Sequence, residues 1–177
     1  MPAPEHFLPT TAIRFRPIGP EDRVGVSKLF SRLSPESRYR RFFGPKPELS
    51  DRELTFFTAV DHVAHEALAA VDQRDCSIVG LVRYVQYVDR PRVAAVAIEV
   101  ADEWQQMGIG SSLLERLLDR ARVNGIDRLS ATTRWENLPA RSLLRRFGFR
   151  GRASGHGEIE LELALDSSPS ACAQSRS

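Results

Sequence analysis

The sequence contains little cysteine and no long apolar run, and each shortage excludes a class of protein. Cys76 and Cys172 are the only cysteines in 177 residues, and neither has a partner at the spacing of a zinc site. We therefore interpret both as free thiols and expect no metal. No apolar stretch approaches the ~18 residues that a membrane helix requires, and residues 1–12 lack the features of a signal peptide. We expect a cytoplasmic protein with no membrane contact.

Lysine is also scarce, although the chain is rich in cations. Lys28 and Lys46 are the only lysines among 25 cationic residues, which leaves 23 arginines against 23 acidic residues and a net charge of +2. This balance argues against binding through bulk positive charge. With 42% hydrophobic and 27% charged residues, the composition is that of a globular protein and excludes collagen-like, disordered and coiled-coil chains.

The first half of the chain is predicted to form a strand, three helices and a three-stranded meander. Apolar residues at helical spacing indicate a helix over residues 21–33. Ser34 before Pro35, and Ser50 three residues before Glu53, are typical starts of two more helices. Short polar turns between the later extended segments favour antiparallel pairing. The predicted strands are residues 12–18, 66–71, 77–88 and 92–101.

The second half alternates between helices and strands. Residues 110–124 have a leucine-rich stripe on one side and charged residues on the other, as expected for an amphipathic helix. The next predicted elements are a strand, a helix and a last strand, over residues 128–133, 138–147 and 157–165. Since a helix connects the strand over 92–101 to the strand over 128–133, these two strands are predicted to be parallel.

These elements predict a single domain over residues 12–166, of mixed α/β (α+β) class. Its central sheet is expected to be mostly antiparallel with one parallel βαβ pair, and helices are expected on both faces. Residues 1–11 are predicted to be a flexible N-terminus. Residues 167–177 have the composition of a disordered tail.

Residues 99–112 form the most informative segment, because a central strand leads into a glycine-containing loop and then a helix. The first N–H groups of a helix have no internal partners and lie at the positive end of its dipole, so they can bind a phosphate. Gly108 and Gly110 would allow close approach, and Ser111 adds a hydroxyl. The loop has no lysine, which excludes a P-loop, and Leu113 stands where the dinucleotide fingerprint requires glycine.

The pattern that remains in Gln105–Gly110, [QR]xxGx[GA], resembles the GNAT superfamily of acyl-CoA-dependent N-acyltransferases. Residues 136–149 look like that family's ENxxAxxLxxxxGF element. Residues 16–22 and 33–51 are similar to the GNAT domain of bacterial protein-lysine acetyltransferases. The resemblance covers residues 13–165.

The resemblance implies a site for coenzyme A. Backbone groups of Ile98 and Val100 would hold the pantetheine arm, and Asn137 would lie near it. The implied pyrophosphate site comprises Gln105, Gln106, Met107, Gly108, Ile109, Gly110 and Ser111. The implied reaction transfers an acetyl group from acetyl-CoA to a primary amine, either a protein lysine or a small amine, by direct attack in a ternary complex. No metal is implied, and a homodimer stays open.

The groups that family members commonly use for proton transfer are missing. Where lysine acetyltransferases of the family place a glutamate, this chain has Ala95, and Leu143 and Leu144 occupy the tyrosine position of the last helix. Glu99 is the nearest replacement, because strand side chains alternate and it shares a face with Ala95. We predict Glu99 as the catalytic base.

Other interpretations of the same residues stay open. In the alternative interpretation, Glu99 is exposed to solvent or is paired with an arginine such as Arg83 or Arg134. Glu66 is a weaker candidate for the base. The alternative to an enzyme is a catalytically degenerate GNAT domain that senses acyl-CoA or binds a protein partner. The arginine clusters over residues 38–41 and 141–152 are interpreted as solvated helix faces. A nucleic-acid-binding function rests only on these clusters and is disfavoured.

Overall fold

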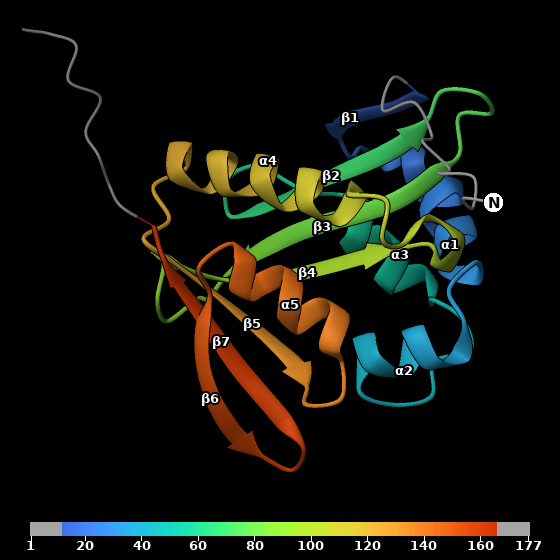
Figure 1. Ribbon diagram of the computed structural model, residues 1–177. Coiled ribbons are helices and arrows are strands. Elements are labelled where there is room, and N and C mark those ends of the chain that lie inside the picture. The colour runs from blue at the N-terminus through green and yellow to red at the C-terminus, as the bar shows by residue number, and fades with distance from the viewer. Residues whose placement is uncertain (1–11, 166–177) are drawn as a thin grey trace, which may run out of the picture.

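Residues 12–165 are described by the computed structural model, and they form a seven-stranded sheet with helices on both faces (Figure 1). The strand order is β1-β2-β3-β4-β5-β7-β6. The predictions for residues 1–11 and 167–177 lie outside the described residues. Within residues 12–165, no helix is long and apolar enough to cross a membrane.

The predicted elements appear in the predicted order, with one addition. The strands are β1 (Ile13–Pro17), β2 (His65–Asp72), β3 (Ile78–Gln86), β4 (Val93–Val100), β5 (Arg128–Arg134), β6 (Arg150–Gly155) and β7 (Glu158–Ala164). The α-helices are α1 (Arg23–Ser31), α2 (Pro35–Phe42), α3 (Asp51–Thr58), α4 (Ile109–Val123) and α5 (Leu138–Arg146), with short 3₁₀ turns η2 (Pro20–Asp22) and η3 (Asp102–Trp104). Strand β6 is not predicted by the sequence, because its residues, RGRASG, show no apolar alternation.

Most neighbouring strands pair antiparallel, and β4 and β5 form the predicted parallel pair. Their pairing covers only Val93 to Ala95 of β4 and Arg128 to Ser130 of β5. Beyond that point the two strands diverge (Figure 1). The rest of β4 therefore has β3 on one side and no paired strand on the other.

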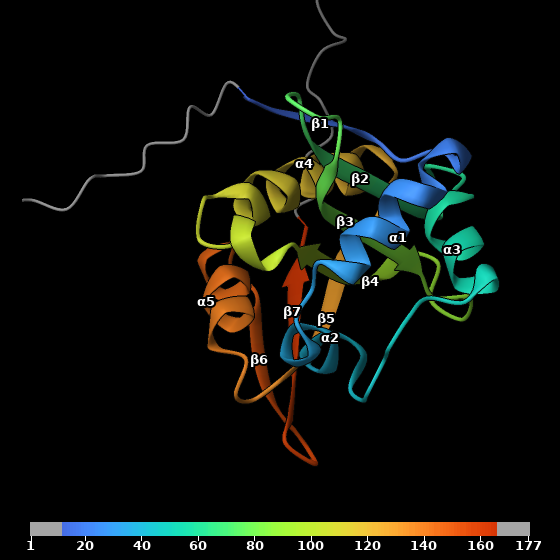
Figure 2. The ribbon, with the colours of Figure 1, turned by 90° about the vertical axis from the view of Figure 1, so that its right-hand side faces the viewer.

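The two faces of the sheet carry different helices. Helices α4 and α5 lie on one face and α1 and α3 on the other (Figures 1 and 2). The leucine stripe of α4 is buried against β2 and β3, with Leu113, Leu114 and Leu117 fully inaccessible to solvent. This burial fixes the start of α4 beside the end of β4.

Helix α2 is held by polar contacts and by Phe42, which packs against the core with its ring centre 5.4 Å from that of Phe30. None of its eight described residues is buried. The Ser34 hydroxyl accepts a hydrogen bond from the Ser37 N–H at 3.1 Å, which caps the helix. The Arg38 guanidinium donates to the carbonyl oxygens of Leu33 at 2.9 Å and Pro47 at 2.7 Å.

We expect Ser34→Ala to lower the free energy of unfolding by about 1 kcal/mol, because it removes the side-chain cap of a helix that has no fully buried residue. Urea denaturation measures this change. Ser34→Asp keeps an accepting oxygen and is expected to stay close to wild type. An equal loss in both variants would show that the hydroxyl does not cap α2.

Candidate active site

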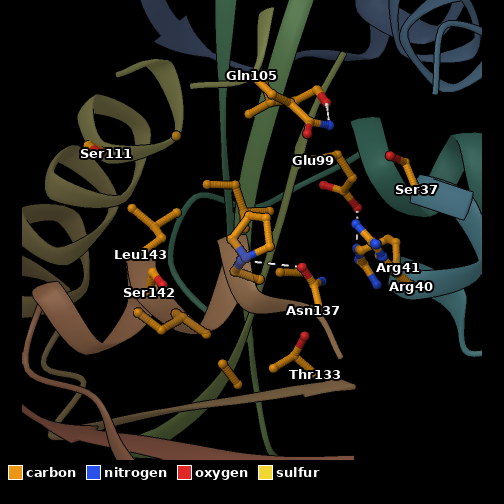
Figure 3. A pocket seen from close by; sticks show the side chains of 18 of the residues that line it. Ser37, Arg40, Arg41, Glu99, Gln105, Ser111, Thr133, Asn137, Ser142 and Leu143 are labelled. Carbon is orange, nitrogen blue, oxygen red and sulfur yellow. Dashed lines mark hydrogen bonds and ion pairs between the residues drawn. The ribbon is translucent and has the colours of Figure 1, made fainter. Parts of the chain in front are cut away.

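A cleft of about 520 Å³ occupies the space where β4 and β5 diverge (Figure 3). It is lined by the second half of β4, the following loop, β5, and parts of α2, α4 and α5. One end lies at the first turn of α4, where Ser111 is found, and the other at α2, where Ser37 and Arg41 are found (Figure 3). The cleft therefore passes between the strands from one helix layer to the other.

Most residues that the sequence predicts for the site line this cleft. They are Ile98, Glu99, Val100, Gln105, Gln106, Gly108, Gly110, Ser111 and Asn137. Met107 and Ile109 do not line it. Met107 is 46% exposed, whereas Ile109, the first residue of α4, is buried in the core.

Backbone groups of β4 form the edge of the cleft. The Ala101 N–H donates to the Val79 carbonyl at 2.9 Å, and the Val93 carbonyl accepts from Tyr87 N–H at 2.9 Å. Odd-numbered residues of β4 therefore direct their backbone groups to β3, since these directions alternate along a strand. Those of Ile98 and Val100 point to the opposite side, where β5 has diverged.

The loop after β4 has a backbone that favours glycine. Gly108, the residue before α4, has φ of +82°, in the left-handed region. Gly110 lies against α5 and β4, since a Cβ there would be 3.3 Å from Leu143 Cδ2 and 3.6 Å from Ile98 Cδ1. The Gln105 side chain holds the loop by donating to the Val100 carbonyl at 3.1 Å. The first N–H groups of α4 therefore face an approachable space, and this donor set fits an anionic phosphate.

A cation from another helix lies beside this loop. Arg146, at the end of α5, donates from Nη2 to the Ser111 hydroxyl and lines the cleft. Arg40 and Arg41 line the cleft from α2. Arg141 is 7% exposed and stacks 3.9 Å from the centre of the Trp135 ring. The interpretation of the arginine clusters as solvated helix faces is therefore wrong for Arg141, which is buried, and for Arg41, which is paired with buried Glu99.

Asn137 caps α5 as well as lining the cleft. Its Oδ1 accepts a hydrogen bond from the Ala140 N–H at 3.3 Å (Figure 3). A capping asparagine fixes where the helix begins. The residue therefore positions α5 against the diverging strands.

Glu99 is buried in the cleft wall and is ion-paired. It is 7% exposed, and its Oε1 accepts from Arg41 Nε at 2.6 Å, whereas its Oε2 has no hydrogen-bond partner among residues 12–165 (Figure 3). The alternative partners considered from the sequence, Arg83 and Arg134, do not make this contact. Arg134 is instead ion-paired with Glu136 at 3.4 Å. Helix α2 supplies the partner, 58 residues away in sequence, so no local pattern could have indicated it.

A second buried arginine lies close to this pair. The Arg83 guanidinium is 3.9 Å from the centre of the Phe57 ring, and the residue is 9% exposed. Burial lowers the pKa of Arg83 to about 10; the Glu99 charge opposes this shift and the Arg41 charge adds to it. At neutral pH Arg83 is therefore still a cation, and one carboxylate faces two guanidinium groups.

The positions of the missing family groups carry apolar side chains. Ala95 pairs with Ser130 at the last contact between β4 and β5. Leu144 is buried in the core, and Leu143 lines the cleft. Glu66 is fully buried but does not line the cleft; its Oε2 accepts from Arg120 of α4 at 2.7 Å. Glu99 is therefore the carboxylate that the described structure brings to the cleft.

Comparison with known proteins agrees with this geometry. The acetyltransferase (GNAT) family model matches residues 29–149. The chain belongs to the GNAT acetyltransferase family. It is 30% identical over 142 residues to an acetyltransferase of Pseudomonas aeruginosa, covering 79% of this chain and 76% of that protein.

Solved GNAT structures share the fold. The crystal structure of the GNAT domain of S. lividans PAT is 31% identical, with a TM-score of 0.81 over 86% of this chain and 90% of that one. An acetyltransferase from Salmonella typhimurium, solved with its cofactor acetyl-CoA, has a TM-score of 0.73 at 19% identity, covering 91% of this GNAT chain and 99% of that one.

Gly108→Val is expected to weaken coenzyme A binding at least tenfold. A β-branched residue is strained at this positive φ and would crowd the space in front of the helix N-terminus. Gly125→Val is the matched control, because Gly125 follows the other end of α4 with φ of +73° and also has open space around it. Isothermal titration calorimetry with coenzyme A compares the two. If both variants weaken coenzyme A binding equally, the effect comes from strain in the helix alone.

Arg146→Met is expected to weaken coenzyme A binding about tenfold, because a charged hydrogen bond to phosphate contributes about 1.5–3 kcal/mol. Arg145→Met removes a neighbouring exposed cation that does not line the cleft. Titrations of both variants with coenzyme A at low and high salt distinguish the two arginines, since only Arg146→Met should reduce the salt dependence of binding. Unchanged affinity for Arg146→Met would remove this residue from the phosphate site.

Proposed function

We propose that the chain transfers an acetyl group from acetyl-CoA to a primary amine, a protein lysine or a small amine, by direct attack in a ternary complex. The supporting observation is the cleft between β4 and β5, with phosphate-type donors at one end and a buried carboxylate toward the other. Membership of the GNAT family supports acetyl-CoA as the donor. We propose that residues 12–166 form this activity as one domain.

In this proposal, the α4 end of the cleft binds coenzyme A. The N–H groups of Gly110 and Ser111, together with Arg146, hold the pyrophosphate, and Gln105 and Gln106 shape the loop. Met107 and Ile109 contribute backbone groups only, because their side chains do not line the cleft. The edge groups of Ile98 and Val100 hold the pantetheine arm, and Asn137 lies beside it. Acetyl-CoA supplies the activated thioester.

The acceptor must lose a proton before it can attack. For a lysine-like amine with a pKa near ~10.4, this deprotonation costs about 4.6 kcal/mol at pH 7. Glu99 lines the cleft and its Oε2 has no hydrogen-bond partner among residues 12–165, so it can accept that proton while Arg41 holds Oε1. The C–N bond then forms as the C–S bond breaks, and the second proton that the nitrogen loses neutralises the thiolate, which leaves as coenzyme A. The Ile98 N–H is the donor proposed to stabilise the developing oxyanion.

Glu99→Gln is expected to lower kcat by a factor of about 10²–10⁴, the usual contribution of a general base, and to leave coenzyme A affinity unchanged. Glu66→Gln is the matched control, since it also removes a buried charge paired with arginine but on the α4 side of the sheet. Release of coenzyme A from acetyl-CoA is measured with a panel of amines and lysine peptides.

Two results would contradict the proposal. Full turnover by Glu99→Gln would remove this residue as the base. Binding of coenzyme A without acetyl transfer to any amine would instead favour the non-catalytic alternative, a domain that senses acyl-CoA or binds a protein partner.

A further inference from the structure

The ion pair between Arg41 and Glu99 leaves one donor and one acceptor unused. An arginine and a carboxylate commonly pair through two parallel hydrogen bonds, whereas here only Nε and Oε1 are joined, at 2.6 Å. Arg41 Nη2 and Glu99 Oε2 are both buried, and neither has a partner within residues 12–165. Buried polar atoms are normally hydrogen-bonded, so a bound molecule that offers one acceptor and one donor would satisfy both atoms.

Both residues line the cleft. Arg41 approaches from α2 and Glu99 from β4, and Figure 3 shows the two side chains pointing toward each other at the end of the cleft away from Ser111. In the proposed function this end receives the acceptor. The residues that carry the unused donor and acceptor therefore line the acceptor's part of the cleft.

The charge of this cluster is unbalanced. Arg83 is nine-tenths buried, and its Nε and Nη1 have no hydrogen-bond partner in the described part of the chain. Arg83 lies opposite Ala97, diagonal to Glu99, so two positive charges lie near one carboxylate. Of the other arginines around the cleft, Arg40 is paired with Glu36 and adds no uncompensated charge. A simple alkylammonium would bring a third positive charge into the cluster, which buried charges strongly oppose.

We propose that the acceptor is a zwitterion, an amine that carries a carboxylate close enough for both groups to reach this ion pair at once. The ammonium donates to Glu99 Oε2, the carboxylate accepts from Arg41 Nη2, and the added negative charge offsets Arg83. This assignment rests on the proposed function and names the acceptor class of the same cleft. A free amino acid and a lysine beside an acidic residue in a peptide both present this chemistry.

The test compares acceptors that differ only in the carboxylate. Glycine, β-alanine and γ-aminobutyrate are each paired with their carboxamides, and a Glu-Lys-Glu peptide with a Gln-Lys-Gln peptide. We expect at least a tenfold higher kcat/KM for the carboxylate member of the preferred pair. The amine of a carboxamide is the less basic one, so deprotonation alone would favour the opposite order. A preference within one of the amino-acid pairs identifies a free amino acid as the acceptor. A preference within the peptide pair identifies a lysine in a peptide.

Arg83 provides the variant that tests the charge argument. Arg83→Met removes the excess cation and places an apolar side chain against Phe57, and we expect it to reduce the carboxylate preference about tenfold. Arg134→Met is the matched control: Arg134 also stacks on an aromatic ring, Tyr39, but is already paired with Glu136, so its loss should leave the preference unchanged. Arg83→Lys retains the positive charge and should show the same carboxylate preference as the wild-type protein. Thermal unfolding confirms that each variant is folded.

The outcomes separate this inference from the proposed function. Equal or better use of the carboxamides by the wild-type enzyme overturns the zwitterion and leaves acetyl transfer intact. If no acceptor is acetylated, the proposed function fails. Calorimetric titration of the amino acids into the complex with coenzyme A then decides the inference. Tighter binding of the acids than of their amides supports it, and equal binding overturns it.

Discussion

The early end of the hydrogen bonding between β4 and β5 is the constraint on which the site depends. The two strands pair only from Val93 to Ala95 and from Arg128 to Ser130. A parallel pair requires a crossover, and α4 makes it, so the N-terminus of α4 lies beside the end of β4. Divergence after Ala95 then exposes the backbone of Ile98 and Val100 to a cleft that a continuous sheet would not contain.

The preference for arginine over lysine has a structural explanation in the interior and around the cleft. A guanidinium group is planar and stacks on aromatic rings while it keeps several donors. Buried Arg83 lies on Phe57, and buried Arg141 lies on Trp135. A lysine at these positions would keep the charge but lose the stacking and the fixed direction of its hydrogen bonds. At these buried positions arginine therefore contributes packing as well as charge.

The carboxylate at the cleft occupies a different position from that expected for lysine acetyltransferases of the family. Ala95 is the last residue of β4 that pairs with β5, so the position of the family's glutamate is at the closed end of the divergence. Glu99 lies four residues later on the same face, beside α2, where Arg41 can reach it. Burial of this charge is tolerated because arginines surround it, and the same arginines make the acceptor's own charge important.

Sequence by itself determined the elements whose signals are local. The Ser50–Glu53 capping box forms as predicted, and so do the leucine-rich face of α4 and the glycine loop before it, because these features depend on residues a few positions apart. Tertiary structure decided the pairing of Glu99 with Arg41, the placement of Arg146 at Ser111, and the position of β6 at the edge of the sheet. Contacts between distant segments depend on how helices and strands pack, and a single sequence carries no local record of that packing.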